Sequence, residues 1–449
     1  MLVEEFFSAI CGPPLASNTA ISKDVGIYAH TLWPSYAAKS SFKKSQTPPN
    51  CLVANETHVF AAQNDRAYVH VYSRMRGNQE AFVPFTEKIR CLTLAGDGTV
   101  LVLGSAEGRV MLWETCTGRL VTTPATHVQA VSCLAATPYH LLTGSEDSNV
   151  HVWNLTQLLE LGSTAEFEPE RRLSNHRGAI TGLVAGQGIN PDTSICVSAS
   201  RDKTCIIWNY QTGVTLRTLL FPSSPLCIAL DPCSRALYVS SEDGSIFSIG
   251  FFGTKALLGP QSDEAASTVV QVSQPFGAVP SESRPATCLG VSYDGSVLLS
   301  GHPKGQIHLW NLGDSGANSS IRELGNLNAA VTNIVFVSPL SSEQKPTKPW
   351  TVVKPTQAEG QYTLTTQFEA DFGTETRFNS MLETPGFSQE VLESAILSLQ
   401  QPSAPTSGRE EDMQRQIDEL WEIINQQRAL QKETVQRLAE HKSNKTARS

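Results

Sequence analysis

Histidine, serine and aspartate occur in this 449-residue sequence in a combination that could carry out nucleophilic hydrolysis. His176, Ser198 and Asp202 form the clearest set, because a serine activated by a histidine that an aspartate orients is a catalytic triad. An earlier stretch repeats part of this pattern, with His127, Thr143 and Asp147. A set that recurs is more typical of a structural scaffold than of one active site, so we predict no catalytic residues.

Other signatures of catalytic or ligand-binding sites are absent from the sequence. It has no GxxxxGK[ST] phosphate loop, and the spaced glycines of residues 182–188 are not followed by a helical pattern. Neither HxE nor HExxH occurs, and no Cys/His group has the spacing of zinc ligands. We therefore expect no cofactor and no bound metal.

Ten cysteines are scattered over the first 288 residues, and none forms a CxxC pair. Several lie in apolar runs that resemble strands, where cysteine behaves as a small buried hydrophobe: Cys91, Cys133, Cys196, Cys205 and Cys288. Ten cysteines without the spacing of a disulfide framework favour a reducing compartment, the cytosol or the nucleus. The first residues lack the basic start of a signal peptide, and no run approaches the ~18 apolar residues of a membrane helix, so we expect no membrane association.

An internal repeat supplies the elements that must position these residues. A small-residue strand end, an acidic turn and an alternating strand that ends in an aromatic residue recur, as in GSEDSNVHVW and SASRDKTCIIW. The copies end at Thr31, Tyr72, Trp113, Trp153, Trp208, Ile249 and Trp310. Their spacings are 41, 41, 40, 55, 41 and 61 residues, and a period near 40 matches the WD repeat.

Seven copies predict an all-β, seven-bladed WD-repeat β-propeller in which each blade contains four short strands. Two long intervals hold polar or Gly/Pro/Ser-rich stretches around 155–175 and 252–284, which we interpret as loop insertions. The strand at 329–337 has no acidic turn of its own, and the N-terminal strands form half a blade. We therefore predict that the N-terminal strands complete the last blade and close the ring, which removes exposed sheet edges.

The repeat assigns the polar residues to a structural hydrogen-bond network, because a buried indole N–H needs a partner. The predicted network consists of His176, Ser198, Asp202 and Trp208 in blade four and His127, Thr143, Asp147 and Trp153 in blade three. Blade five lacks the tryptophan, and Lys304 replaces the acidic turn residue in blade six. Such departures weaken a local network without changing the fold, because neighbouring blades share the core.

The chain beyond the repeats has a different character. Residues 338–362 are rich in Pro, Ser, Thr, Lys and Gln and predict a linker. Phe368, Phe372 and Phe378 stand among acids, either as a docking segment that orders on a partner or as a strand or loop packed on the propeller. An amphipathic pattern predicts a short helix at 388–401, which Pro402 ends.

A longer helix is predicted at 409–441. Ser407 and Glu410 form a capping box before it. One side of the helix carries an apolar strip that consists of Met413, Ile417, Leu420, Trp421 and Ile424. A polar helix with one apolar strip usually needs a partner, so this strip predicts oligomerisation or partner docking, with packing against its own propeller as the alternative.

The resulting domain division is a propeller at 1–355, a linker with a docking segment and short helix at 356–408, the helix at 409–441, and a basic tail at 442–449. The net charge is −9 at pH 7, which does not favour binding of nucleic acid through bulk charge. Three basic residues lie near the blade-four turns, namely Arg177, Arg201 and Lys203. They either contact RNA or acidic protein or are solvated turn charges, so direct RNA contact stays open.

Several stretches also resemble one known family. They are SNHRGAITGL (174–183), ICVSASRDKTCIIWNYQTG (195–213), LRTLLFPSSPLCIALDPCSRALYV (216–239) and EEDMQRQIDELWEIINQQ (410–427). Together they resemble the WD-repeat subunit of the pre-ribosomal Rix-type complex, the fungal pre-rRNA-processing protein with its animal relative. The resemblance extends in order over most of the chain but is weak at 252–284 and 340–380.

This resemblance implies a non-enzymatic scaffold in maturation of the large ribosomal subunit, including removal of the second internal transcribed spacer. It implies a helical-repeat scaffold subunit, a smaller third subunit, a midasin-type AAA ATPase and the pre-60S particle as partners, in the nucleolus and nucleoplasm. It also implies self-association through the terminal helix. Two alternatives remain: a chromatin or replication-licensing adaptor on the same scaffold, and a propeller hydrolase with carboxylates in its central channel.

Overall fold

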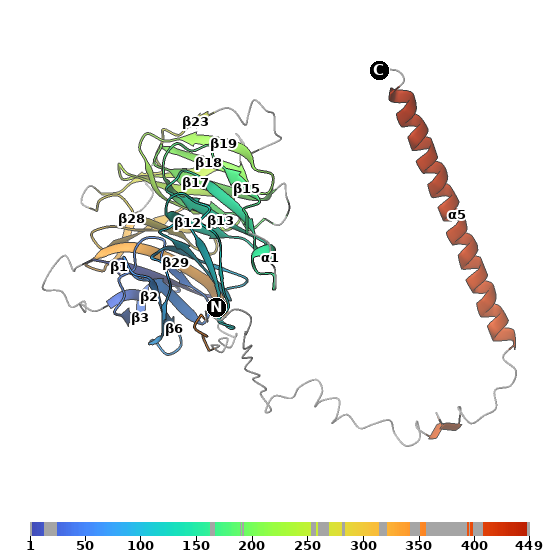
Figure 1. Ribbon diagram of the computed structural model, residues 1–449, viewed down its shortest axis with the longest axis horizontal. Helices are drawn as coiled ribbons and strands as arrows, with labels where there is room; N and C mark the ends of the chain where they lie inside the picture. Colours follow the sequence, from blue (N-terminus) through green and yellow to red (C-terminus); the bar gives the residue numbers. More distant parts are fainter. Residues whose placement is uncertain are drawn as a thin grey trace. The chain divides into compact units, whose positions relative to one another are not determined.

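The computed structural model describes residues 2–12, 25–161, 167–188, 190, 193–252, 257–258, 269–280, 283–313, 321–341, 351–355, 393–394, 396–397 and 407–446. The chain divides into two units, Met1–Gln367 and Phe368–Ser449. The first unit is built from seven sheets, which are the blades of a β-propeller (Figure 1). The predicted fold class is therefore confirmed.

The first three blades run from the inside of the propeller outward in chain order. Blade one contains β4 (Leu52–Ala54), β5 (His58–Ala62), β6 (Tyr68–Ser73) and β7 (Gln79–Pro84). Blade two contains β8 (Ile89–Ala95), β9 (Val100–Ser105), β10 (Val110–Glu114) and β11 (Leu120–Thr122). Blade three contains β12 (Val131–Ala136), β13 (His140–Ser145), β14 (Val150–Asn154), the helix α1 (Leu155–Leu158) and β15 (Arg171–Leu173).

The next three blades hold the two insertions. Blade four contains β16 (Ile180–Ala185), β17 (Ile195–Ser200), β18 (Thr204–Asn209) and β19 (Val214–Leu220). Blade five contains β20 (Pro225–Leu230), β21 (Ala236–Ser241), β22 (Ser245–Gly250) and β24 (Gly277–Ala278). Blade six contains β25 (Cys288–Val291), β26 (Val297–Gly301), β27 (Gln306–Asn311) and β28 (Ile321–Asn326).

The insertion at 252–284 is only partly the loop that the sequence predicts. Its strand β23 (Val269–Gln271) pairs in parallel with β19 and makes blade four a five-stranded sheet. The chain then returns to form β24, the outer strand of blade five. Both strands are too short for their periodicity to be recognised in the sequence.

Blade seven joins the two ends of the propeller. It contains β29 (Ala330–Ser341), β1 (Leu2–Cys11), β2 (Val25–Trp33) and β3 (Ala37–Lys43), in that order from the inside. The antiparallel pairing of β1 with β29 runs from Leu2 opposite Ser341 to Cys11 opposite Ala330. The predicted closure of the ring by N-terminal strands is therefore confirmed.

Burial explains why these short sequences form strands. The second strand of a blade, such as β5, β9 or β17, is buried at every residue, because each blade is packed between two neighbours. The turn after that strand requires a positive φ, which Gly108 supplies in blade two and Lys203 in blade four. A Cβ at Gly108 would lie 2.2 Å from the His127 carbonyl oxygen, so only glycine fits there.

The second unit contains the helix α5 (Ser407–Thr446), which is longer at both ends than the predicted 409–441 and includes part of the predicted basic tail. The capping side chains of Ser407 and Glu410, the three phenylalanines at 368–378 and most of the short helix at 388–401 lie outside the described residues. Residues 393–394 and 396–397 are helical. No helix in the described part of the chain is both long and apolar enough to span a membrane.

Candidate functional site

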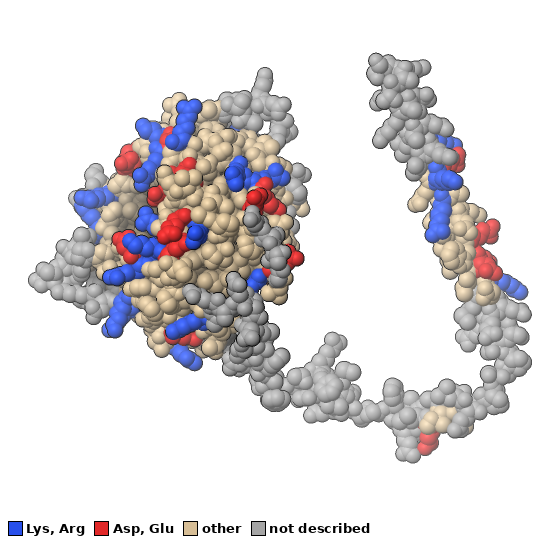
Figure 2. All heavy atoms as spheres, viewed as in Figure 1, with Lys and Arg blue, Asp and Glu red and all other residues tan. Residues whose placement is uncertain are grey.

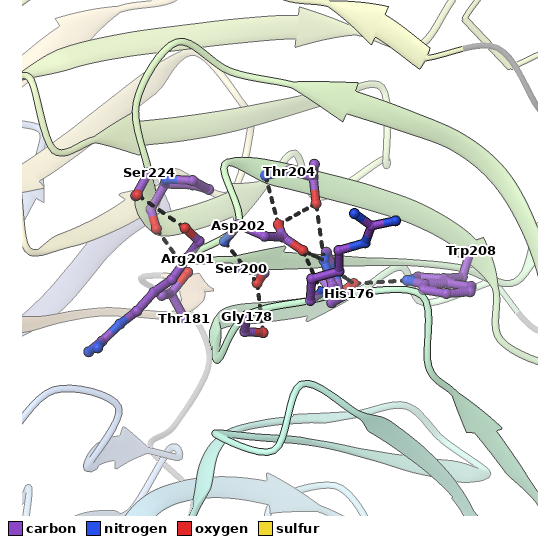
Figure 3. Close-up of polar contacts among 12 residues, drawn as sticks. His176, Gly178, Thr181, Ser200, Arg201, Asp202, Thr204, Trp208 and Ser224 are labelled. Atoms are coloured by element: carbon purple, nitrogen blue, oxygen red, sulfur yellow. Dashed lines mark hydrogen bonds and ion pairs between the residues drawn. The ribbon is translucent and has the colours of Figure 1, made fainter.

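Blade four holds its predicted polar residues in one continuous hydrogen-bond chain (Figure 3). His176 Nδ1 lies 3.2 Å from Asp202 Oδ2, and its Nε2 lies 2.8 Å from Ser198 Oγ. The indole N–H of Trp208 donates to the same Ser198 oxygen at 2.8 Å. Asp202 also accepts the backbone N–H of Arg177, so the aspartate in the β17–β18 turn fixes the loop that carries the histidine.

This chain has the Asp–His–Ser connectivity of a catalytic triad without the access that catalysis requires. Ser198 is 0% exposed, and His176 is 6% exposed. The serine oxygen already contacts the imidazole and the indole, so it has no free direction towards a substrate. The arrangement therefore joins the loop, the second strand and the third strand of blade four.

Blade three contains the same chain with a threonine. His127 contacts Asp147 at 3.1 Å through Nδ1 and Thr143 at 2.8 Å through Nε2, and Trp153 Nε1 donates to Thr143 at 3.2 Å. The ring of His151 stacks on His127 with centroids 3.9 Å apart. The structure thus brings together all eight residues predicted for the two networks.

Hydrogen bonds within the two networks lower the pKa values of their aspartates. Burial opposes ionisation of Asp147, but hydrogen bonds from His127 and from backbone N–H groups lower its pKa to about 2. The pKa of Asp202 is also lowered, because hydrogen bonds from His176 and Thr204 outweigh its burial. Both aspartates therefore stay ionised and act as fixed acceptors.

Blade six contains a third network that the sequence analysis missed. His302 Nε2 lies 2.9 Å from Ser300 Oγ, which accepts the Trp310 indole N–H at 2.9 Å, and His302 Nδ1 contacts the Arg284 carbonyl at 2.9 Å. The histidine comes from the turn after β26 instead of the loop before β25. The SGH triplet at 300–302 is present in the sequence, but its histidine does not have the spacing of His127 and His176 in blades three and four.

Blade five replaces the network with apolar side chains. Phe221 stands four residues before β20, as His176 does before β16, and Val239 and Ile249 take the serine and tryptophan positions. All three are buried in one cluster. Because the histidine, serine and tryptophan positions are all apolar in blade five, none of the three leaves a buried donor or acceptor without a partner, which explains why the fold tolerates the missing tryptophan.

The centre of the propeller contains a cavity of about 500 Å³ between the innermost strands. Every blade contributes at least one aliphatic side chain to its lining, and one from each blade is Leu52, Leu92, Leu134, Leu183, Ile228, Leu289 and Ile334. None of the described residues that line this cavity is charged, and none is a histidine. A hydrolase with carboxylates in the channel would need acidic side chains here, so the geometry disfavours that alternative.

A circle of hydrogen bonds surrounds this cavity. In every blade a thiol or hydroxyl near the start of the innermost strand donates to a backbone carbonyl of the next blade. The seven contacts are Cys51 to Arg90, Cys91 to Val131, Ser132 to Ile180, Thr181 to Pro225, Cys227 to Ala286, Thr287 to Val331 and Thr332 to Thr47. The last contact closes the circle across the junction of the chain ends.

The circle gives three of the cysteines a structural role. Burial raises the pKa of Cys51, Cys91 and Cys227 well above the usual value, which keeps these thiols protonated as donors and unreactive. Burial also raises the pKa of Cys133 and Cys288 to about 12. Among the described residues no group of three or more His, Cys, Asp or Glu side chains could hold a metal ion.

Charged side chains of both signs are interspersed over the propeller face in view (Figure 2). Arg177, Arg201 and Lys203 are all exposed, and the Lys203 ammonium donates to the Pro222 carbonyl at 3.3 Å. These residues belong to the loop and turn that hold the blade-four network, and Figure 3 shows Arg201 beside it.

The apolar strip of α5 is exposed in the second unit. The exposed fractions are 47% for Ile417, 59% for Leu420, 54% for Trp421 and 40% for Ile424. The side chain of Met413 lies outside the described residues. A tryptophan and three aliphatic side chains at helical spacing thus face solvent within this chain.

Comparison with known proteins gives a consistent result. The WD domain, G-beta repeat family matches residues 118–154 and 167–209. The pre-rRNA-processing protein IPI3 of Yarrowia lipolytica is 30% identical over 324 residues, which cover 70% of this chain and 74% of that protein. Human WD repeat-containing protein 18 is 30% identical over 69% of this chain and 70% of its own length.

Two further comparisons agree. The pre-rRNA-processing protein crb3/ipi3 of Schizosaccharomyces pombe is 25% identical over 64% of this chain and 68% of its own length. A chain in the crystal structure of the mitotic checkpoint complex has a TM-score of 0.50 at 19% identity, covering 64% of this chain and 80% of that one, and supports the fold alone. The closed seven-bladed ring and the 30% sequence identity to IPI3 over most of both chains show that the protein belongs to the IPI3/WD repeat-containing protein 18 family of WD-repeat proteins.

Proposed function

We propose that this chain is a non-enzymatic scaffold subunit of a pre-ribosomal complex, needed for maturation of the large ribosomal subunit and removal of the second internal transcribed spacer from pre-rRNA. The observation that carries this proposal is the 30% identity to the pre-rRNA-processing protein IPI3 over 74% of that protein. The buried serine of the blade-four triad and the uncharged central cavity support a binding role over a hydrolytic one.

The proposed partners follow from the family resemblance. They are a helical-repeat scaffold subunit, a smaller third subunit, a midasin-type AAA ATPase and the pre-60S particle, and the proposed location is the nucleolus and nucleoplasm. A rigid propeller supports this role, because a closed ring of blades presents its turns and loops as fixed surfaces for several partners.

We also propose that residues 1–355 form the propeller domain and that α5 is a separate self-association element. The exposed strip of Ile417, Leu420, Trp421 and Ile424 supports this, because such a strip loses contact with water when two helices pair. In the networks of blades three and four, we propose a structural role for all eight residues.

Affinity purification tests the proposed assembly. The full chain and residues 1–405 are each purified from nuclear extract, and the bound proteins are identified by mass spectrometry. We expect large-subunit precursor proteins with both, because the propeller is present in both. Recovery of chromatin-licensing factors without any pre-ribosomal protein would instead support an adaptor of chromatin and refute the proposal.

A further inference from the structure

Blade two retains the tryptophan of the WD network but has lost the residues that would bind it. Trp113 is fully buried and faces Leu101, as Trp208 faces Cys196 in blade four. Two residues beyond Leu101, the position of the hydroxyl is occupied by Leu103. The position of the histidine, four residues before the innermost strand, is occupied by Phe85.

These replacements leave the Trp113 indole N–H without an acceptor in its own blade. The Phe85 ring lies 6.0 Å from the Trp113 ring and offers it only an edge contact. In blades three, four and six the corresponding indole donates to a Ser or Thr of the same blade. A buried N–H without an acceptor is unfavourable, so blade two needs an acceptor from elsewhere.

The chain beyond the last propeller strand supplies that acceptor. Trp113 Nε1 donates to the Val353 carbonyl at 3.0 Å, across a separation of 240 residues in the sequence. The Val353 N–H donates in return to the Thr115 carbonyl at 2.8 Å. Val352 packs against the apolar cluster that contains Trp113.

The β10–β11 turn is shaped for this segment. A Cβ at Gly118 would lie 2.7 Å from the Lys354 carbonyl oxygen and 2.8 Å from the Val353 side chain. Residues 351–355 therefore meet blade two through two apolar side chains, a reciprocal pair of hydrogen bonds and one close backbone approach. Such contacts recognise an extended peptide mainly through its backbone.

We infer that blade two carries a slot for an extended apolar peptide and that the chain fills it with its own residues 351–355. The segment replaces the missing hydroxyl of the blade-two network and is part of the propeller. It also fixes the place on the propeller from which the chain continues towards α5. This inference is independent of the proposed role in ribosome maturation.

Two variants of the full chain test the slot. Val352→Asp places a charge against the apolar cluster, whereas Thr351→Asp places the same charge on the exposed neighbouring residue. We expect Val352→Asp to abolish amide hydrogen-exchange protection within residues 351–355 and to lower the melting temperature by about 2–6 °C. Thr351→Asp is expected to leave both unchanged.

A synthetic peptide with the sequence of residues 349–356 provides a second measurement. Added in excess, it is expected to restore the melting temperature of Val352→Asp and to leave that of the wild-type chain unchanged, because there the slot is filled. The inference is overturned if Val352→Asp retains protection of residues 351–355, or if the peptide fails to restore its melting temperature.

Discussion

Single residues determine how each blade is held together. Blades three, four and six join loop and strands through a histidine, a hydroxyl and an indole, and blade five replaces that set with Phe221, Val239 and Ile249. Blade two keeps the tryptophan without the histidine and the hydroxyl, and the Trp113 indole N–H donates to a carbonyl in residues 351–355. In each of these blades that retains the tryptophan, its indole N–H therefore has an acceptor, which is a hydroxyl of the same blade or, in blade two, the Val353 carbonyl.

Trp208 is the largest buried side chain of the blade-four network. Replacing it with alanine removes a buried aromatic side chain, and we expect a loss of about 3–5 kcal/mol in the free energy of unfolding. Trp208→Phe keeps most of the packing and removes the N–H donor to Ser198, so its loss should be about 1 kcal/mol. Denaturant titration measures both, and wild-type stability in Trp208→Ala would contradict the burial.

Three buried histidines predict a stability that depends on pH. Burial lowers the pKa of His30 and His302 to about 4 and that of His151 to about 3, whereas histidine in an unfolded chain titrates near 6.5. Between these values the unfolded chain binds protons that the folded chain excludes. This contribution to stability is therefore complete above pH 6.5 and is lost as the pH falls towards 4.

Melting temperatures between pH 7.5 and 4.5 measure this effect, and we expect little change above pH 6.5 and a decrease from pH 6.5 to 4.5. His151→Phe is a suitable comparison, because it keeps a ring against His127 and removes one titrating group. Its melting temperature should depend less steeply on pH. A wild-type curve that is flat between pH 6.5 and 4.5 would contradict the assignment.

At the level of elements, the junction of β1 with β29 is what turns a row of blades into a ring. The sequence predicted this junction, because the strand at 329–337 lacked the rest of a blade and the N-terminus lacked the start of one. It did not predict β23, since three residues paired in parallel show no periodicity. It also predicted a linker at 338–362, which is wrong for the end of β29 and for the segment at 351–355.

Deleting residues 1–33 removes β1 and β2 and leaves β29 with an unpaired edge. We expect a lower melting temperature and a broader transition, because the blades then no longer form a closed ring. Differential scanning calorimetry compares this variant with the full chain. An unchanged melting temperature would show that closure does not stabilise the propeller.

The strip on α5 predicts the oligomeric state. Leu420→Asp with Ile424→Asp places two charges in the strip and should reduce the mass measured by light scattering to that of a single chain, with the propeller still folded. The control is Gln426→Asp with Ala429→Asp, which adds the same charge on the side of the helix opposite the strip, given 100° per residue. An unchanged mass in the first variant would refute self-association through this helix.

For the whole molecule, fold and family were accessible from the sequence, whereas several details of the interior were not. The 40-residue period and the repeats of the GSEDSNVHVW type were sufficient to predict seven blades. The circle of donors from Cys51 to Thr332 could not be predicted, because it mixes thiols and hydroxyls and becomes apparent only when neighbouring blades are in place. For the same reason the cysteines were recognised as buried residues but not as donors.

The central claim is that the chain acts as a scaffold in processing of the large-subunit rRNA precursor. The most direct test is to deplete the protein and to measure precursors that retain the second internal transcribed spacer by northern blot, with re-expression of the wild-type chain as the control. The account predicts that these precursors accumulate on depletion and return to their normal level on re-expression. Normal precursor levels after complete depletion would contradict it.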